Sequence, residues 1–240
     1  MSRRILIPTI ALAALVVLGG AGAYVYFFSG LRTSPATLAL GSPSATTSAS
    51  ASTTAASGGT WTVTSGSLAG YRVKEQFVGQ SSAHEAVART GAVTGTVTIT
   101  KSGDTYTMST AKITVQLSGL ASVDSVAGYN VTNRDRIVQQ ALDVQSFPTA
   151  VFQASSVELP PATATGQTIT VSVPGQLTVH GVTKDVTATL QLRVSSASAQ
   201  VAGTISTNMT DFGVSPPSIG FTTVQTALTI EVSLNLAQSA

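Results

Sequence analysis

The feature that most constrains this sequence is a strict alternation of apolar and polar residues in its later two thirds. The clearest run is near the end, where every second residue from Leu228 to Leu236 is Leu or another aliphatic residue. Residues 186–194 repeat this spacing, and shorter runs lie at 93–99, 113–117, 169–173 and 177–179. A period of two predicts β-strands with one apolar and one polar face. Because no helical crossovers separate the runs, we expect an all-β antiparallel sandwich or barrel.

One segment, residues 132–144, reads as a helix. Thr132 or Asn133 can cap its start, and Phe147-Pro148 ends it. Its apolar stripe consists of Ile137, Val138, Ala141 and Leu142. A single amphipathic helix beside a barrel is expected to cover one end of it.

The amino-terminal residues 5–28 carry no charge and exceed the roughly 20 residues that a helix needs to cross a bilayer. We predict a transmembrane anchor there, with residues 1–4 in the cytoplasm because Arg3 and Arg4 precede it. The protein is then a single-pass cell-membrane protein whose carboxy-terminal domain is extracytoplasmic. Residues 21–23, Ala-Gly-Ala, leave a cleaved signal sequence and secretion as the alternative.

Residues 29–59 form the next segment, which from residue 33 onward is almost entirely Ser, Thr, Ala, Pro and Gly. This composition predicts a disordered tether, since it buries too little apolar surface to offset the entropy of ordering. The globular domain is predicted at residues 60–240. It has no cysteine and no basic run, which argues against disulfides and against nucleic-acid binding.

Catalytic and metal-binding residues are not indicated. The two histidines, His84 and His180, are too few for a structural zinc site without cysteine. We expect His84 in a solvated loop and His180 in a turn before Gly181. No Gly-x-Ser-x-Gly elbow selects a triad, and the acidic residues show no paired arrangement. The sequence therefore predicts a protein that is not an enzyme and needs no cofactor or metal.

Two groups of residues allow more than one interpretation. Arg134-Asp135, at the start of the predicted helix, can clamp a ligand headgroup at the barrel mouth, or can serve only as a cap and surface ion pair. The phenylalanines at 77, 147, 152, 212 and 221 can fill a core, or can line an apolar pocket if the barrel is hollow.

Taken together, several motifs resemble the YceI-like family of lipocalin-shaped, polyisoprenoid-binding domains, over residues 61–236. The matching elements are YRVKEQFVG at 71–79, GAVTG at 91–95, Arg134-Asp135, FPTAVF at 147–152, GQLTVHGVTK at 175–184 and DFG at 211–213. Residues 125–132 depart from the pattern, because they carry Gly and Val where the family has a more charged run.

The resemblance implies an eight-stranded antiparallel lipocalin-like β-barrel with the short helix at its mouth. It also implies non-catalytic binding, with transport or storage, of an isoprenoid lipid or quinone, and it allows a homodimer. The candidate pocket residues are Phe77, Arg134, Leu142, Phe147, Phe152, His180 and Phe212. The alternatives are an envelope interaction or structural β-domain without a ligand, and a lipid-directed hydrolase that uses His180 or Asp135.

Overall fold

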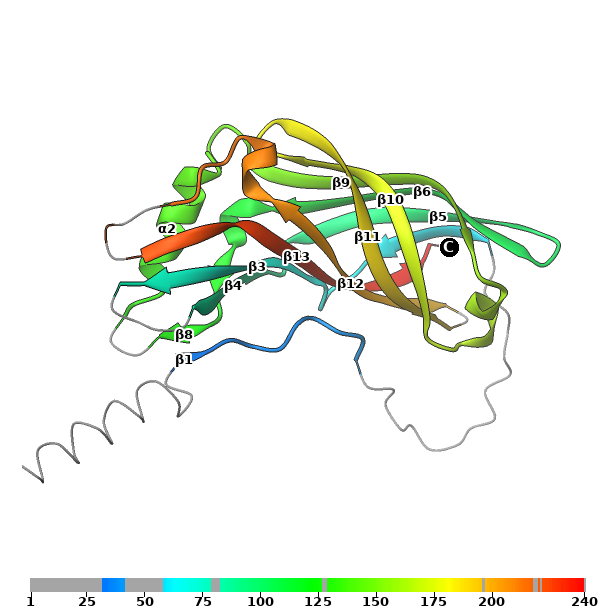
Figure 1. Cartoon of the computed structure of the whole chain (residues 1–240). Helices are drawn as coiled ribbons and strands as arrows, with labels where there is room; N and C mark the ends of the chain where they lie inside the picture. The colour runs from blue at the N-terminus through cyan, green and yellow to red at the C-terminus, as the bar shows by residue number, and fades with distance from the viewer. Residues whose placement is uncertain are drawn as a thin grey trace, which may run out of the picture.

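A computed structural model describes residues 32–41, 58–78, 83–126, 129–195, 197–217, 220 and 222–239 (Figure 1). The predicted anchor at residues 5–28 lies outside this part of the chain, as do residues 42–57 of the predicted tether. Within the described ranges, no helix has both the length and the apolar character needed to cross a membrane.

The described part is built mainly of β-strands, with one α-helix and three short 3-10 segments. The strands are β1 (Arg32–Thr33), β2 (Gly59–Val63), β3 (Leu68–Phe77), β4 (His84–Thr90), β5 (Val93–Ser102), β6 (Thr105–Gln116), β7 (Ala121–Ser122), β8 (Ser125–Val126), β9 (Thr149–Leu159), β10 (Ile169–Val179), β11 (Val182–Val194), β12 (Ser198–Asn208) and β13 (Thr222–Gln238). The helical segments are η1 (Leu117–Gly119), α2 (Thr132–Ala141), η2 (Pro161–Thr165) and η3 (Met209–Phe212).

Eight strands close into a barrel, which confirms the predicted all-β antiparallel fold. Their order around the ring is β2, β5, β6, β9, β10, β11, β12 and β13, and the ring closes because β13 pairs with both β12 and β2. β3 also pairs with β13, beyond the short β2, and is followed by β4 and β7. α2 lies at this end of the barrel, and the β5–β6 turn lies at the other (Figure 1). We call these the α2 end and the distal end.

The alternation in the sequence decides which side chains point inward. β13 places every second side chain from Leu228 to Leu236 in the barrel interior, while Glu231 and its polar neighbours face outward. The predicted runs at 169–173 and 177–179 prove to be one continuous strand, β10, whose apolar side chains also face inward. The hydrophobic effect therefore fixes the register of these strands, since a slip by one residue would turn every apolar side chain outward.

The predicted helix is confirmed as α2, but it is shorter than residues 132–144 and begins differently. The N-cap residue is Val131, without a side-chain cap, in place of the predicted Thr132 or Asn133. The Asn130 side-chain oxygen instead accepts a hydrogen bond from the Thr132 N–H at 3.1 Å. After the helix, a turn closes where the Phe147 N–H donates to the Asp143 carbonyl at 2.8 Å.

The prediction of a disordered tether is wrong for residues 32–41. β1 pairs with β8, and the following residues run in extended form along the outside of the barrel as far as Gly41 (Figure 1). The physical reason is that barrel side chains hydrogen-bond to backbone groups of this segment. Every residue type carries a backbone carbonyl group, and all except proline carry an N–H. A segment rich in Ser, Thr, Ala, Pro and Gly can therefore be ordered by hydrogen bonds to its backbone, even though it buries little apolar surface.

The β10–β11 hairpin turns on two residues, His180 and Gly181, whose φ angles are 52° and 72°. A Cβ added to Gly181 would lie 2.6 Å from a carbon of the Phe147 ring. We expect Gly181→Ala to lower the free energy of unfolding by about 2 kcal/mol, from the left-handed backbone and from this clash. Gly103→Ala is the control, because its φ is also positive but no atom lies within 4 Å of the added Cβ. If denaturant titrations show equal losses in the free energy of unfolding for both variants, the clash with the Phe147 ring does not contribute.

Candidate functional site

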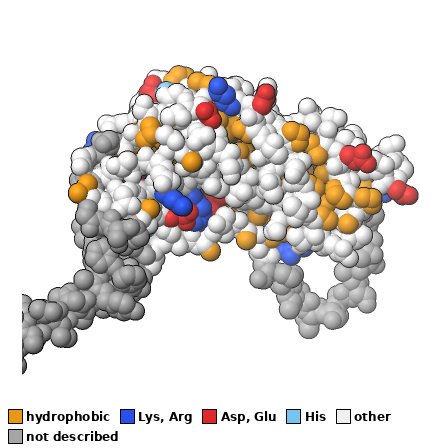
Figure 2. Space-filling view, viewed as in Figure 1, with side chains coloured by type: hydrophobic (Ala, Val, Ile, Leu, Met, Phe, Trp, Pro, Cys, Tyr) orange, Lys and Arg blue, Asp and Glu red, His pale blue; other side chains and the backbone are white. Residues whose placement is uncertain are grey.

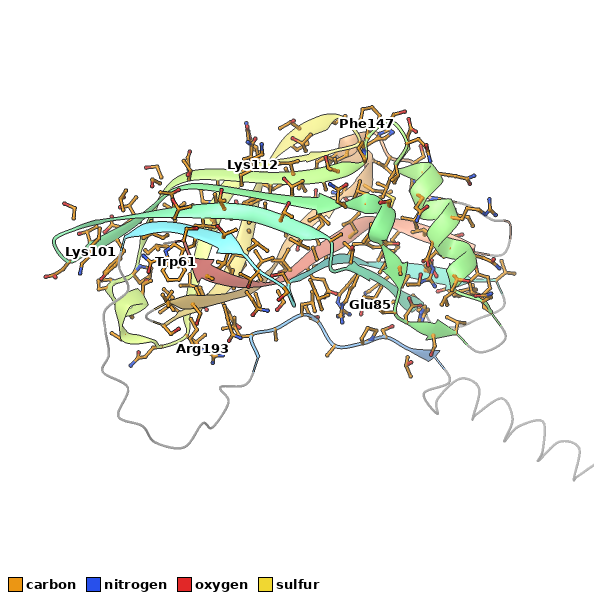
Figure 3. The ribbon with its side chains drawn as sticks, turned by 180° about the vertical axis from the view of Figure 1, so that it is seen from behind. Trp61, Glu85, Lys101, Lys112, Phe147 and Arg193 are labelled. Carbon is orange, nitrogen blue, oxygen red and sulfur yellow. The ribbon has the colours of Figure 1, made fainter. Side chains whose placement is uncertain are left out.

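The barrel encloses an apolar cavity with a volume of about 320 Å³. Its wall consists of the inward faces of the strands, and at the α2 end it includes Ile137, Val138 and Ala141 of the helix. At the distal end the wall reaches Trp61, which lies opposite the helix end of the barrel (Figure 3). The volume falls in the range of small-molecule sites in proteins.

Small residues at inward positions keep this interior open. An eight-stranded barrel is usually just wide enough for side chains to fill it, so a cavity requires positions with little or no side chain. The lining contains such residues on strands from all sides of the barrel. They are Ala69, Ala111, Ala150, Ala188, Ala199 and Gly203. An apolar ligand fits this interior better than a polar one.

A buried polar cluster forms part of the cavity wall at the α2 end. The Arg134 guanidinium donates to both carboxylate oxygens of Asp124, at 2.7 and 3.1 Å, from Nη1 and Nη2. Its Nε lies 2.9 Å from a carboxylate oxygen of Glu75, as an ion pair without hydrogen-bond alignment. His84 Nε2 and the Val87 N–H also contact Asp124, at 2.7 and 3.0 Å. Arg134 and Glu75 border the cavity, so this cluster contributes charged groups to its lining.

The environment changes the proton affinity of these groups in different directions. Burial alone would raise the pKa of Asp124, but hydrogen bonds from His84, Arg134 and the Val87 amide outweigh it and hold the pKa well below its usual range. Burial raises the pKa of Glu75, although Arg134 opposes the shift. Burial also raises the pKa of Tyr71, which lines the same end. Tyr71 is therefore a neutral phenol that can donate a hydrogen bond to a ligand.

The seven candidate pocket residues separate into two groups. Arg134, Leu142, Phe152 and Phe212 border the cavity. Phe77, by contrast, packs at the α2 end against Tyr129 and His84, with ring centroids 5.9 and 6.4 Å apart.

Phe147 and His180 contact each other on the side of the barrel near α2, with ring centroids 5.0 Å apart (Figure 3). His180 Nδ1 lies 3.2 Å from the carbonyl oxygen of Phe212. This places His180 in a turn, as expected, and it joins that turn to η3. The ligand-binding roles of all seven residues stay predictions.

The prediction that His84 lies in a solvated loop is wrong. His84 begins β4 and is only 4% exposed, because the strand turns its side chain toward the buried Asp124 at the α2 end. Continuing the alternation back from Ala88 through Ala86 to His84 would have indicated an inward position. Asp124, 40 residues away along the chain, gives no comparable signal.

Of the two interpretations of Arg134-Asp135, the one as a cap and surface ion pair needs correction, while the headgroup clamp stays a prediction. Arg134 is not a surface group, since it is 6% exposed and paired with Asp124 and Glu75. Asp135 neither caps the helix nor pairs with Arg134. Its Oδ1 accepts hydrogen bonds from the N–H and hydroxyl of Ser122, at 2.9 and 2.6 Å, and so joins α2 to β7. No group of three metal-binding side chains occurs among the described residues.

Comparisons with known proteins bear on the fold and the family. Among solved structures, the chain is similar to a polyisoprenoid binding domain from Saccharophagus degradans implicated in plant cell wall breakdown. The identity is 13% and the TM-score 0.52, over 75% of this chain and 98% of that one. Two other similar structures are BcnA of Burkholderia cenocepacia (16% identity, TM-score 0.47, 70% and 95% covered) and the Campylobacter jejuni YCEI protein (13%, 0.37, 62% and 83%). No curated protein matches the chain.

The first of these similarities shows a shared barrel fold. The family model of the YceI-like domain matches residues 48–236, which is well over half of the 240-residue chain and includes all of the barrel except the last two residues of β13. The chain therefore belongs to the YceI-like family.

Proposed function

We propose that this protein binds an isoprenoid lipid or quinone non-catalytically, with the apolar tail inside the barrel, and serves in its transport or storage. The observation that carries the proposal is the cavity, which is lined mainly by apolar side chains along the barrel. The similar domain from Saccharophagus degradans, described as polyisoprenoid binding, supports the same ligand class. Each Å² of apolar ligand surface that leaves water contributes about 25 cal/mol to such binding.

The polar groups are placed to orient the ligand rather than to react with it. Arg134 and Tyr71 border the cavity at the α2 end and are hydrogen-bond donors. The distal part of the wall is apolar at Trp61, Ile99 and Leu236. We infer that a polar headgroup lies at the α2 end and that the tail extends toward Trp61. The same proposal places the chain in the cell membrane through residues 5–28, with the barrel extracytoplasmic.

Filling the cavity is expected to abolish lipid binding. Ala188 is 2% exposed and borders the cavity, so Ala188→Trp puts an indole ring where the ligand tail would lie. Native mass spectrometry of the full chain, purified in detergent from a bacterial host, measures the lipid that stays bound. We expect an isoprenoid adduct on the wild type and at least a tenfold lower occupancy in Ala188→Trp. The same spectra give the stoichiometry of the chain and so test the homodimer.

The matched control is Thr189→Trp, which adds the same ring to the outward face of the same strand. It should keep the wild-type lipid occupancy, and thermal melting should show that both variants are folded. A wild type that binds no lipid after incubation with polyprenyl lipids and quinones would contradict the proposal. An interaction domain without a ligand would then explain the fold better.

A further inference from the structure

Residues 32–41, which we call the strap, have a defined path on the barrel surface. β1 pairs with β8 at the α2 end, where Thr33 lies opposite Ser125. The next residue, Ser34, donates a side-chain hydrogen bond to the Glu85 carbonyl of β4. The strap ends near β11 and β12, where Arg193 donates to the Gly41 carbonyl at 2.6 Å. The chain therefore enters the strap at the α2 end and leaves it toward the distal half of the barrel (Figure 1).

A charged site on the outer face holds the middle of the strap. Glu231 accepts hydrogen bonds from Arg72 Nε at 2.8 Å and from Arg89 Nε at 2.7 Å, and it is 0% exposed. Acidic and basic side chains lie next to one another on this face (Figure 2). The same three side chains bind the strap backbone. The Leu38 N–H donates to Glu231 at 3.1 Å, while Arg72 and Arg89 donate to the carbonyl oxygens of Pro35 and Ala36.

This path limits where the membrane can lie, given the anchor proposed above. Only residues 29–31 separate Phe28, the last residue of that anchor, from Arg32 in β1. Four peptide steps of at most about 3.5 Å each span about 14 Å. The strap thus brings the α2 end close to the bilayer, whereas a free tether over residues 29–59 would leave the barrel unoriented.

Exposed apolar side chains occur at the same end. Of the large hydrophobic residues that the structure describes, Val78 and Val123 are the exposed ones, at 75% and 47%. Val78 directly follows β3, and Val123 lies between β7 and β8, beside the strap. Both positions belong to the α2 end, where Tyr129 and Arg134 border the cavity. These two exposed valines would be shielded from water if this end of the barrel lay against lipid.

From these observations we propose that the strap holds the α2 end of the barrel against the lipid bilayer, and that the ligand enters and leaves the cavity at this end. This inference rests on the proposed function for its anchor and its lipid ligand. It adds a surface, the α2 end, and a partner, the bilayer. It also gives the strap a role that a plain spacer would not have.

The test uses the full chain, which has no cysteine of its own. Single variants Val123→Cys and Asp104→Cys carry a fluorophore at the α2 end and at the exposed β5–β6 turn of the distal end. The proteins are reconstituted in nanodiscs of phosphatidylethanolamine and phosphatidylglycerol that contain headgroup spin-labelled lipid. We expect quenching at residue 123 to be at least fivefold stronger than at residue 104. Equal quenching at the two positions would overturn the proposal.

A matched pair of insertions separates the strap from an ordinary tether. A 20-residue Gly/Ser spacer adds a root-mean-square span of about 25 Å. Placed between residues 30 and 31, it should reduce quenching at residue 123 to the level at residue 104. Placed between residues 41 and 42, it should leave quenching unchanged, because the docked strap precedes it. Equal effects of the two spacers would show that the strap does not orient the barrel.

Failure of this inference can be distinguished from failure of the proposed lipid binding. Native mass spectrometry on the same preparations gives lipid occupancy independently of orientation. A barrel that is oriented but carries no isoprenoid would refute the ligand and keep the role of the strap. A chain that does not stay with the nanodiscs would refute both the anchor and this inference.

Discussion

Asp124→Ala is expected to lower the free energy of unfolding by about 3–5 kcal/mol, the usual loss when one partner of a buried ion pair is removed. The Asp124 side chain is 0% exposed and accepts hydrogen bonds from Arg134 and the Val87 amide. Its removal leaves these donors buried without their acceptor. Asp124→Asn should lose less, because its amide oxygen can still accept from Val87. Denaturant titrations of the full chain in detergent, followed by fluorescence of the single buried tryptophan, Trp61, measure both losses.

The control for Asp124 is Asp185→Asn, since Asp185 is exposed and hydrogen-bonds only to Gln176 in the described contacts. Its effect should stay within about 0.5 kcal/mol. The loss in Asp124→Ala should also depend on pH. Because the folded-state pKa of Asp124 is lowered, its contribution is present above the unfolded pKa of about 3.9 and is lost as the pH falls toward the folded value. A loss that is equal to that of Asp185→Asn at pH 7 would contradict the role of the buried cluster.

The sequence predicted the barrel wall well and the polar contacts poorly, for a physical reason. The alternation of apolar and polar residues along a strand is a local signal. Because the apolar face of each strand is buried, this signal directly predicts that Leu228, Val173 and Leu192 point inward. The cluster around Asp124 depends on His84 and Arg134, which lie 40 and 10 residues away along the chain. Such pairings follow from the complete topology, which no local pattern specifies.

The strap shows a second limit of inference from sequence. Its middle is held by the amide of Leu38 and by two backbone carbonyls, so its side chains carry little information about docking. The side chains that bind the strap belong to the barrel, and two of them, Arg72 and Glu231, are 159 positions apart in the sequence. In the sequence no local pattern links these two charges. Only the pairing of β3 with β13 brings them together.

Glu231→Gln is expected to lower the free energy of unfolding by about 3 kcal/mol at pH 7, because Arg89 loses its carboxylate partner and the buried Arg72 keeps only the partly exposed Glu85. Burial alone would raise the pKa of Glu231, but hydrogen bonds from Arg89, Arg72 and the Leu38 amide outweigh it and lower the pKa. A lowered folded-state pKa gives stability above the unfolded value of about 4.3, and this stability disappears as the pH falls through the folded value. The difference between wild type and variant, measured by denaturant titration, should therefore shrink in acid.

Glu158→Gln is the matched control, because Glu158 is exposed on β9 and its replacement should cost no more than about 0.5 kcal/mol at any pH. Leu38→Pro removes the strap amide that donates to Glu231 and leaves the barrel residues unchanged. If the strap and the charged site act as one unit, this change should cost less stability in the Glu231→Gln background than in the wild type. Additive losses would instead mean that the barrel keeps its buried charges without the strap, and that the strap contributes only its own backbone contacts.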